Sequence, residues 1–462
     1  MKTLDLTTGS ITKHVRDLAL PSSIGLFFQT MYNVVDSFYA GKISTEALAA
    51  LGFSFPVYLL VIAASSGLSR GSSALIANAI GAREADKQHL YVSQAFSLGG
   101  FVSVFLTAFG FTVARPLFEL LGASGVTMEA AMQYMTPIFI GAVFFVATNL
   151  CNAILVANGD SKTFGKVLVV GFFLNLILDP WFLFGGFGLP AMGISGIAWA
   201  TVAIQVASSV FMVSTVLKRE LLDLSSWRVL IPNFKTYLEI AEQALPASFN
   251  VMSVAMGFLI TTYFLKFYGD ATVASFGVTT RIEQIVLMPT FGLYTAIMAL
   301  VGQNNGAKKY DRIGETMRTC NLIGMTLNII SSILIYVFAG PLMRIFTADE
   351  AVIEIGVDCI RILAFIQWCY LTNLIHLAML QAIKRPMYGF FETVIRKIIL
   401  PLPFLWIFVF KWGFDVTSVW WIIAGTSLLM TIITVAYAQT VLRKLMQNKN
   451  PKDKTSDPKL MT

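Results

Sequence analysis

Long apolar stretches separated by short polar segments run along the whole 462-residue chain. Most are as long as the roughly 20 residues that a helix needs to cross a bilayer. The ten-residue segments of alternating polarity typical of a membrane β-barrel do not occur. The pattern therefore predicts an all-α integral membrane protein with twelve transmembrane helices, at residues 18–40, 50–78, 92–114, 130–157, 165–185, 193–217, 240–267, 275–301, 316–339, 355–382, 389–411 and 416–443.

The second half of the chain repeats the first. Leu20-Pro21-Ser22-Ser23 recurs as Leu245-Pro246-Ala247-Ser248, and the same offset of 225 residues relates Gly81-Ala82 to Gly306-Ala307. Because six spans is an even number, the second copy enters from the same side as the first, and the two six-helix repeats are parallel. We predict four parts: an N-lobe at 1–217, a cytoplasmic linker at 218–239, a C-lobe at 240–445 and a disordered cytoplasmic tail at 446–462.

Composition and charge agree with a membrane protein. Hydrophobic residues make up 56% of the chain, charged residues 13%, and the mean hydropathy is +0.72. The net charge of +7 does not indicate a nucleic-acid partner, because the basic residues gather in alternate connections, near Arg83, Lys162, Lys308 and Lys384. By the positive-inside rule these connections and both termini are cytoplasmic. We expect a multi-pass protein of the bacterial inner membrane.

Several kinds of chemistry have no counterpart in the sequence. Gly159 to Lys166 lacks the glycine spacing of a phosphate-binding loop, and Val167 stands where Ser or Thr is needed. The four cysteines lie within predicted spans without metal-ligand spacing. We therefore expect no enzyme activity, no cofactor and no metal. Any transport against a concentration gradient would be driven by an ion gradient.

An acidic residue in the first span ends a polar stripe. Asp36 follows Asn33, Tyr32, Gln29, Gly25 and Ser22 at spacings that place all of them on one helix face. Charge inside a membrane is costly and marks function by default. The alternative is that Asp36 faces the outer end of the span near Lys42, but such a role would not need the polar side chains below it.

A second acid lies in the fifth span. Asp179 follows Asn175 by one helical turn, and both spans run outward, so Asp36 and Asp179 have similar depth and can meet. Two carboxyl groups in a poorly hydrated pocket cannot both ionise at low cost, so we expect them to titrate as a coupled pair. Protonation would change the hydrogen bonds of the first span, which has a point of bending at Pro21.

Span 4 adds Tyr134, Asn149 and Asn152 to the candidate cavity. The two asparagines, three residues apart, share a face. Buried amides in hydrocarbon need partners. Each asparagine alone fits interhelical hydrogen bonding equally well.

The second copy lacks the acid pair. Asp36 aligns with Thr261, and Asp179 aligns with Pro403 or Phe404. Span 8 instead carries Arg281 close to Glu283, which fits either contact with a ligand or an ion pair between helices.

A hydrolase alternative rests on Gly193-Ile194-Ser195-Gly196, which looks like the serine motif of rhomboid intramembrane proteases. Nucleophilic catalysis by Ser195 would need a neighbouring base. The candidate base, His376, belongs to the other repeat, and small residues at the start of a span are also explained by close packing.

The repeats, Leu20-Pro21 and the Gly81-Ala82 connection with its copy resemble the multidrug and toxic compound extrusion (MATE) transporters over essentially the full length. The chain is similar to the DinF-like prokaryotic branch, whose N-lobe polar site matches Pro21, Gln29, Asp36, Tyr134, Asn149, Asn152, Asn175 and Asp179. By the same resemblance, Thr201 joins that site. Spans 7 and 10 have no acid after Glu242 and Asp358 respectively, which departs from the NorM-like branch and its C-lobe cation site.

The resemblance implies export of amphiphilic, often cationic drugs from a cleft between the lobes, with bending of span 1 near Pro21 on protonation. Our hypothesis is a monomeric secondary antiporter, surrounded by membrane lipid, that exchanges small organic compounds for protons. Sodium coupling is the first alternative. A lipid or oligosaccharide flippase would require a basic cavity, for which the spans hold few basic residues.

Overall fold

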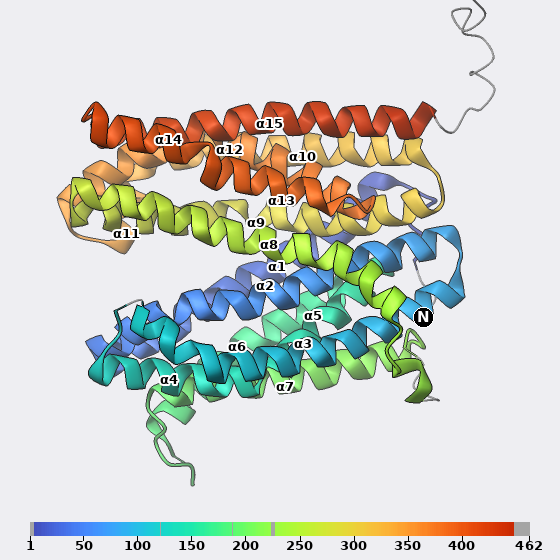
Figure 1. Cartoon of the computed structure of the whole chain (residues 1–462), viewed down its shortest axis with the longest axis horizontal. Helices are drawn as coiled ribbons and strands as arrows, with labels where there is room; N and C mark the ends of the chain where they lie inside the picture. The colour runs from blue at the N-terminus through green and yellow to red at the C-terminus, as the bar shows by residue number, and fades with distance from the viewer. Residues whose placement is uncertain (1–3, 121, 187, 223–226, 448–462) are drawn as a thin grey trace, which may run out of the picture.

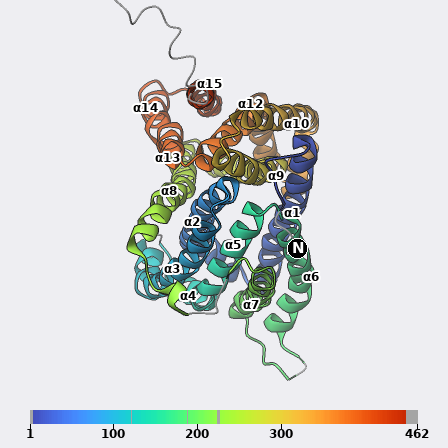
Figure 2. The same ribbon diagram turned by 90° about the vertical axis from the view of Figure 1, so that its right-hand side faces the viewer.

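The computed structural model describes residues 4–120, 122–186, 188–222 and 227–447, and these residues are almost entirely helical. Figure 1 shows the helices running along the long axis of the molecule in two groups, and Figure 2 shows the same groups end-on. We call the end that holds the start of α1 and the α2–α3 connection the basic end. Residues 448–462 of the expected tail lie outside the described residues.

The N-lobe contains the first six spans. Its helices are α1 (Ile11–Ile43), α2 (Thr45–Ala82), α3 (Ala85–Leu120), α4 (Gly125–Ile140), α5 (Ala142–Ala157), α6 (Lys162–Phe184) and α7 (Ile194–Lys218).

The C-lobe contains the second six spans and, as predicted, starts at the same end as the N-lobe (Figure 1). Its segments are α8 (Phe234–Leu265), η2 (Lys266–Tyr268), α9 (Asp270–Gly306), α10 (Tyr310–Val337), α11 (Ala339–Phe346), α12 (Glu350–Ala382), α13 (Pro386–Val394), η3 (Ile395–Ile399), α14 (Pro401–Trp406), η4 (Ile407–Lys411) and α15 (Val416–Gln447).

The predicted set of twelve spans is confirmed. Within the described ranges, nine helices are long and apolar enough to cross a membrane, and the pair α4–α5 makes a tenth span with a 51° bend. The remaining two, α1 and α12, carry polar side chains along their length. The predicted spans are shorter than the helices, because most helices continue beyond the apolar stretch.

Span 4 is broken, which the sequence analysis did not predict. Gly141 separates α4 from α5, and Pro137 one turn earlier removes a backbone donor. The Thr107 hydroxyl on α3 donates to the Phe139 carbonyl at 2.7 Å, so a carbonyl next to the break keeps a partner. Side-chain atoms of Val202 would lie 2.8 Å from a Cβ at position 141, which leaves room only for glycine.

The connection between the lobes is partly helical. Helix α7 extends to Lys218 and α8 begins at Phe234, so both helices enter the predicted range of 218–239, of which 223–226 lie outside the described residues. A short helix, η1 (Trp227–Leu230), follows, and Gln94 of α3 holds it. The Gln94 amide donates to the carbonyls of Val229 and Ile231 at 2.9 Å each and accepts from Asn233 N at 2.8 Å. At the other end of the C-lobe, α15 continues to Gln447, two residues into the predicted tail.

The lobes meet through the first two spans of each repeat. Helix α2 packs along α8, and α1 packs along α9, in a related arrangement. Both crossings use a glycine. A Cβ on Gly67 would overlap Ser248 and lie 2.8 Å from the Ala244 carbonyl, and a Cβ on Gly292 would overlap Ser23 and the Ala19 carbonyl. All three positions in the second copy follow those in the first by 225 residues, so the interface has the pseudo-twofold symmetry of the repeat.

A second pair of symmetric crossings lies at the basic end. A Cβ on Gly81 would overlap the Gln303 carbonyl, and one on Gly306 would overlap the Asn78 carbonyl. Asn78 Nδ2 donates across the lobes to the Ala382 carbonyl at 2.8 Å, and Gln303 Nε2 donates to the Ala157 carbonyl at 2.7 Å. The amino-terminal segment adds to this contact, since Leu6 N donates to Gln303 Oε1 at 3.0 Å.

All direct hydrogen bonds between the two lobes, within the part of the chain that the structure describes, lie toward the basic end. The lobes are therefore closed against each other at that end and are not joined by such bonds at the opposite end.

We expect Gly81→Ala to destabilise this closed arrangement, because its methyl group would overlap the Gln303 carbonyl. Overpacking of this kind costs about 1–3 kcal/mol. Thermal unfolding of the purified protein in detergent measures the effect. Gly100→Ala on α3 is the matched control, since nothing lies within 4 Å of a Cβ there. Equal unfolding temperatures for the two variants would contradict the close crossing.

Candidate functional site

The two predicted acids meet between α1 and α6. Asn175 Nδ2 donates to Asp36 Oδ1 at 3.0 Å and to Asp179 Oδ1 at 2.7 Å, so one amide group bridges both carboxyl groups. Asp36 is 5% exposed, and Asn175 and Asp179 are fully buried. The two carboxyl groups also lie within hydrogen-bonding range of each other. The structure thus brings the predicted trio into one buried cluster, which we call the acid site.

Glycine contacts between α1 and α6 hold the acid site together. A Cβ on Gly25 would lie 2.9 Å from the Gly165 Cα, and one on Gly165 would lie 2.6 Å from the Pro21 carbonyl oxygen. This close approach leaves the acids on the two helices in direct reach of each other. The packing also places Pro21 at the point where α1 crosses α6.

Pro21 lies inside a helix that continues through it. Proline has no N–H, so the Asp17 carbonyl one turn earlier loses its usual helical donor. Hydroxyl groups take over part of the bonding here, since Ser161 Oγ lies 3.4 Å from the Asp17 carbonyl and 2.8 Å from the Leu18 carbonyl. Ser22 Oγ also donates to the Leu18 carbonyl, at 2.9 Å. Near Pro21 the helix therefore depends on hydrogen bonds from side-chain hydroxyls, which can break and re-form if the helix bends.

Three tyrosines surround the acid site. Tyr32, Tyr58 and Tyr134 all lie within electrostatic reach of Asp36, and the Tyr32 hydroxyl is buried close to the side chain of Thr201. Tyr32 and Tyr134 were predicted, but Tyr58 on α2 was not. The signal that marks it is weak: Ser54 precedes it by one turn, on a helix that otherwise looks apolar.

The other predicted residues are less closely grouped. On α1, Gln29 and Asn33 are exposed between the buried Ser22 and the buried Asp36, so the predicted stripe is covered only at its two ends. Thr201 is buried on α7, where its hydroxyl donates to the Ile197 carbonyl at 3.1 Å.

The asparagines of α5 fit the interhelical alternative in part. Asn149 Nδ2 donates to the Phe145 carbonyl of its own helix at 2.9 Å, and the Asn149 carbonyl accepts from Ser69 Oγ at 2.9 Å. Asn152 is half-buried and makes no hydrogen bond to another described residue.

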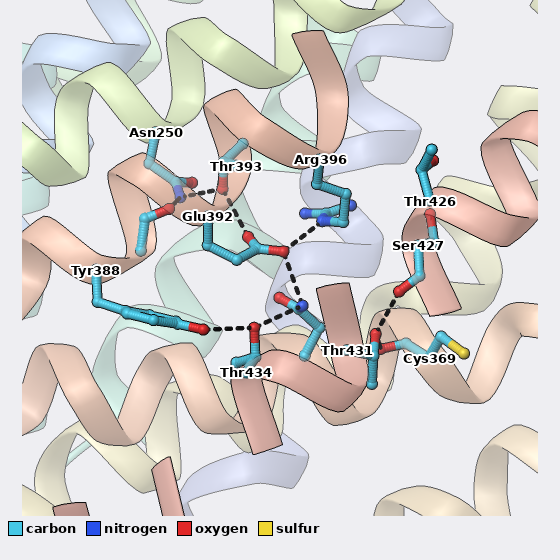
Figure 3. A network of polar contacts seen from close by, with 12 residues as sticks. Asn250, Cys369, Tyr388, Glu392, Thr393, Arg396, Thr426, Ser427, Thr431 and Thr434 are labelled. Atoms are coloured by element: carbon cyan, nitrogen blue, oxygen red, sulfur yellow. Dashed lines mark hydrogen bonds and ion pairs between the residues drawn. The ribbon is translucent and has the colours of Figure 1, made fainter. Parts of the chain in front are cut away.

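The C-lobe holds an ion pair that the sequence analysis missed. Glu392 Oε1 accepts from Arg396 Nε at 2.6 Å and from Asn373 Nδ2 at 2.9 Å, and its Oε2 accepts from the Thr393 hydroxyl at 3.2 Å (Figure 3). The signal in the sequence is the acid–base spacing of one turn within span 11. Asn250 of α8 joins the network, since its Nδ2 donates to the Thr393 hydroxyl at 2.7 Å and to the Gly389 carbonyl at 3.0 Å.

Arg281 of α9 is exposed and forms no ion pair with a described residue, including Glu283. Of the two alternatives for Arg281, the ion pair is therefore not formed in this structure. Side chains at Arg281 and Glu283, two apart, leave a helix in different directions.

The protease alternative is not supported by the geometry. Ser195 Oγ donates to the Met192 carbonyl at 2.8 Å, whereas His376 Nδ1 bonds the Thr372 carbonyl at 2.7 Å on α12 of the other lobe. Gly196 is in close packing, because a Cβ there would lie 2.5 Å from the Phe182 carbonyl oxygen. No group of three metal-ligating side chains occurs among the residues that the structure describes.

An apolar pocket of about 350 Å³ lies between the lobes, and one of its walls is α1, the helix that carries Asp36. The other wall comes from α9. The lining residues are Ser23, Ile24, Phe27, Phe28, Ile285, Met288 and Pro289.

Comparison with known proteins agrees with this architecture. The MatE family model matches residues 21–181 and 246–407, one match in each lobe. The chain is 27% identical to the FAD transporter of Shewanella oneidensis, over 86% of this chain and 88% of that protein. It is 28% identical to the probable multidrug resistance protein NorM of Thermotoga maritima, over 78% and 77% of the two chains.

A solved structure matches as well. It is the outward-facing conformation of a multidrug resistance MATE family transporter of the MOP superfamily, 25% identical, with a TM-score of 0.88 over 97% of this chain and 99% of that one.

We expect Asn175→Leu to lower stability, because it removes the amide that donates to both buried carboxyl groups. Loss of donors to buried acceptors costs about 1–3 kcal/mol each. Thermal unfolding in detergent, at pH 8 and pH 5, tests this, and the loss is expected to be larger at pH 8, where repulsion between ionised carboxyl groups is greatest. Asn152→Leu is the control, since Asn152 makes no such bonds. A loss of the same size in the control would contradict the bridging role.

Proposed function

The chain belongs to the MATE family of transporters, and from this membership we propose that it exports small organic compounds in exchange for protons. Relatives of the family include multidrug resistance proteins, which supports a multidrug substrate range. The observation that carries proton coupling is the single Asn175 amide that bridges Asp36 and Asp179.

The hydrogen bonds of the acid site lack one donor, which a single proton can supply. Ionised carboxyl groups only accept hydrogen bonds, so two of them within hydrogen-bonding range repel unless a proton lies between them. The Asn175 amide supplies one donor to each carboxyl group but none between the two. A proton shared by Asp36 and Asp179 supplies the missing donor. We therefore assign the acid site as the place where the coupling proton binds and leaves.

Proton binding acts on α1 through the same bonds. Asp36 is the α1 member of the acid site, and Asn175 and Asp179 both belong to α6, so a change in the protonation state changes the attachment of α1 to α6. Below the acid site, the helix is held at Pro21 by the hydroxyls of Ser161 and Ser22. We propose that α1 bends there and thereby alters the pocket that it shares with α9.

The pocket between α1 and α9 is our candidate for the drug-binding surface. Apolar and aromatic side chains make up most of its wall, which suits apolar molecules of varied shape. The acid site on the neighbouring part of α1 favours organic cations. Gln29, Tyr32, Asn33, Tyr134, Asn149, Asn152 and Thr201 are proposed to support this cavity.

The distribution of basic residues supports an orientation in the membrane. We propose that the basic end faces the cytoplasm of a bacterial cell, with the chain acting as a monomer in the inner membrane. The exposed apolar side chains along the helices, such as Phe101, Val104 and Phe105, would then contact lipid.

Sodium coupling is the second candidate, and one observation favours it. Asn175 Oδ1 and Asp179 Oδ2 are buried oxygen atoms without a hydrogen-bond partner in the structure. Carboxylate and amide oxygens are the donors that hard cations prefer.

We expect Asp36→Asn and Asp179→Asn each to reduce ethidium efflux from cells by about tenfold or more, because the coupling free energy is lost. Fluorescence of ethidium-loaded cells is the measurement. Asp358→Asn is the matched control, since Asp358 is an exposed acid of α12 in the other lobe. Wild-type efflux in both acid-site variants would refute the proposal.

Transport in proteoliposomes that contain the full-length chain distinguishes proton coupling from sodium coupling. We expect ethidium movement with a pH gradient alone and none with a sodium gradient alone. Transport that follows only the sodium gradient would replace the proton by sodium as the coupling ion.

Pro21→Ala should restore a backbone donor to the Asp17 carbonyl and stiffen α1. We expect slower ethidium efflux from cells with little loss of thermal stability, since alanine favours the helix by about 3 kcal/mol relative to proline. Unchanged efflux would show that α1 does not need to bend at this position.

A further inference from the structure

Two adjacent basic residues lie deep in span 11. Arg396 and Lys397 are both on the π-helical segment η3, ten and eleven residues after the first residue of α13. Charged side chains at such depth are rare and mark ligand or ion pathways. Single π-helical turns within a helix also occur frequently at functional sites. Proton exchange at the acid site uses neither residue.

Arg396 is hydrogen-bonded through Nε, and its two terminal nitrogens remain available. Its Nε donates to Glu392 Oε1 at 2.6 Å, and Glu392 is otherwise occupied by Asn373 and Thr393 (Figure 3). The two terminal guanidinium nitrogens make no hydrogen bond to a described residue, and the side chain remains 10% exposed. A guanidinium held by Nε offers these terminal donors as a fixed fork, which matches the geometry of a carboxylate.

Lys397 has no acidic partner at close range. Its Nζ lies 5.3 Å from the centre of the Tyr370 ring, and no ion pair joins it to a described residue. Glu283 of α9 lies within electrostatic reach, but one of its oxygens, Oε1, is buried without a partner. Arg396 and Lys397 also lie in each other's electrostatic field. Like charges in a medium of low dielectric constant repel, and an anion bound by both relieves that repulsion.

The same lobe presents a third basic residue toward the pocket between the lobes. Arg281 precedes Ile285 and Met288 by four and seven residues on α9, so the three share one helix face, and the latter two line that pocket. The N-lobe holds the acid site, whereas the C-lobe carries these three basic residues together with Glu283 and Glu392.

We propose that Arg396 and Lys397 form an anion-accepting subsite, and that this protein transports organic molecules bearing a carboxylate group in addition to cationic drugs. The carboxylate bonds the terminal nitrogens of Arg396 and the ammonium of Lys397, and Tyr370 lies against the adjoining part of the molecule. This inference rests on the export function proposed above and names a substrate class for it.

Binding of carboxyfluorescein to the full-length protein in phosphatidylcholine nanodiscs tests the subsite. We expect Lys397→Gln to raise the Kd, measured by fluorescence anisotropy, by about tenfold, the effect of losing one charge-assisted hydrogen bond. The variant keeps the Glu392–Arg396 pair, so the C-lobe network stays intact. The Kd for ethidium is expected to change by less than about twofold.

Arg361→Gln is the matched control. It removes one positive charge from the same lobe, at an exposed arginine whose guanidinium lies 5.5 Å from the Tyr336 ring. The subsite is overturned if wild-type protein shows no saturable binding of carboxyfluorescein, if Lys397→Gln leaves its Kd unchanged, or if the two variants weaken it equally.

Ethidium efflux from cells separates this inference from the export function. If wild-type protein exports ethidium and carboxyfluorescein binding is independent of Lys397, the subsite alone fails. If binding depends on Lys397 but neither dye is exported by wild-type cells, the export function fails and the subsite stands.

Discussion

Direct contact between the backbones of helices in opposite lobes is the constraint on which the rest of the structure depends. Gly67 against α8 and Gly292 against α1 allow it in the middle of the molecule, and Gly81 and Gly306 allow it at the basic end. Each pair is related by the repeat offset, so both crossings are made by equivalent positions. At Gly81 and Gly306 backbone meets backbone directly, and at Gly67 and Gly292 a serine side chain lies at the contact beside the backbone. The relative position of the lobes is therefore set by main-chain shape, and their movement requires that these contacts slide or separate.

The two lobes share a scaffold but differ in what they place at equivalent helix crossings. In the N-lobe, Gly25 lies directly on Gly165, and the acid site forms farther along the same pair of helices. In the C-lobe the equivalent positions hold Asn250 and Gly389, joined by a hydrogen bond of 3.0 Å. A glycine contact leaves α1 bound to α6 mainly by packing, whereas the asparagine ties α8 to α13 through directed bonds. This difference is consistent with placing the proposed bend in the first span and not in its copy.

Much of this was accessible from the sequence. Apolar length predicted the twelve spans, the repeat predicted their parallel arrangement, and the common depth of Asp36 and Asp179 predicted that these residues meet. The break at Gly141 was missed, because it depends on how Val202 packs there. The π-helical turns near Pro401 were missed because apolar periodicity does not report them. Glu392 and Arg396 were overlooked, since an acid and a base one turn apart also fit an exposed helix end, and only packing shows that Glu392 is 2% exposed.

The three hydrogen bonds that Gln94 makes, two as donor and one as acceptor, do more than tie down the segment after α7. They fasten Val229, Ile231 and Asn233, which lead directly into the C-lobe, onto a helix of the N-lobe. The register between the lobes is thus maintained by noncovalent contacts on both sides of the connection. A six-span polypeptide with the same contacts has the means to pair with a second copy of itself, which gives gene duplication and fusion a homodimeric ancestor to start from.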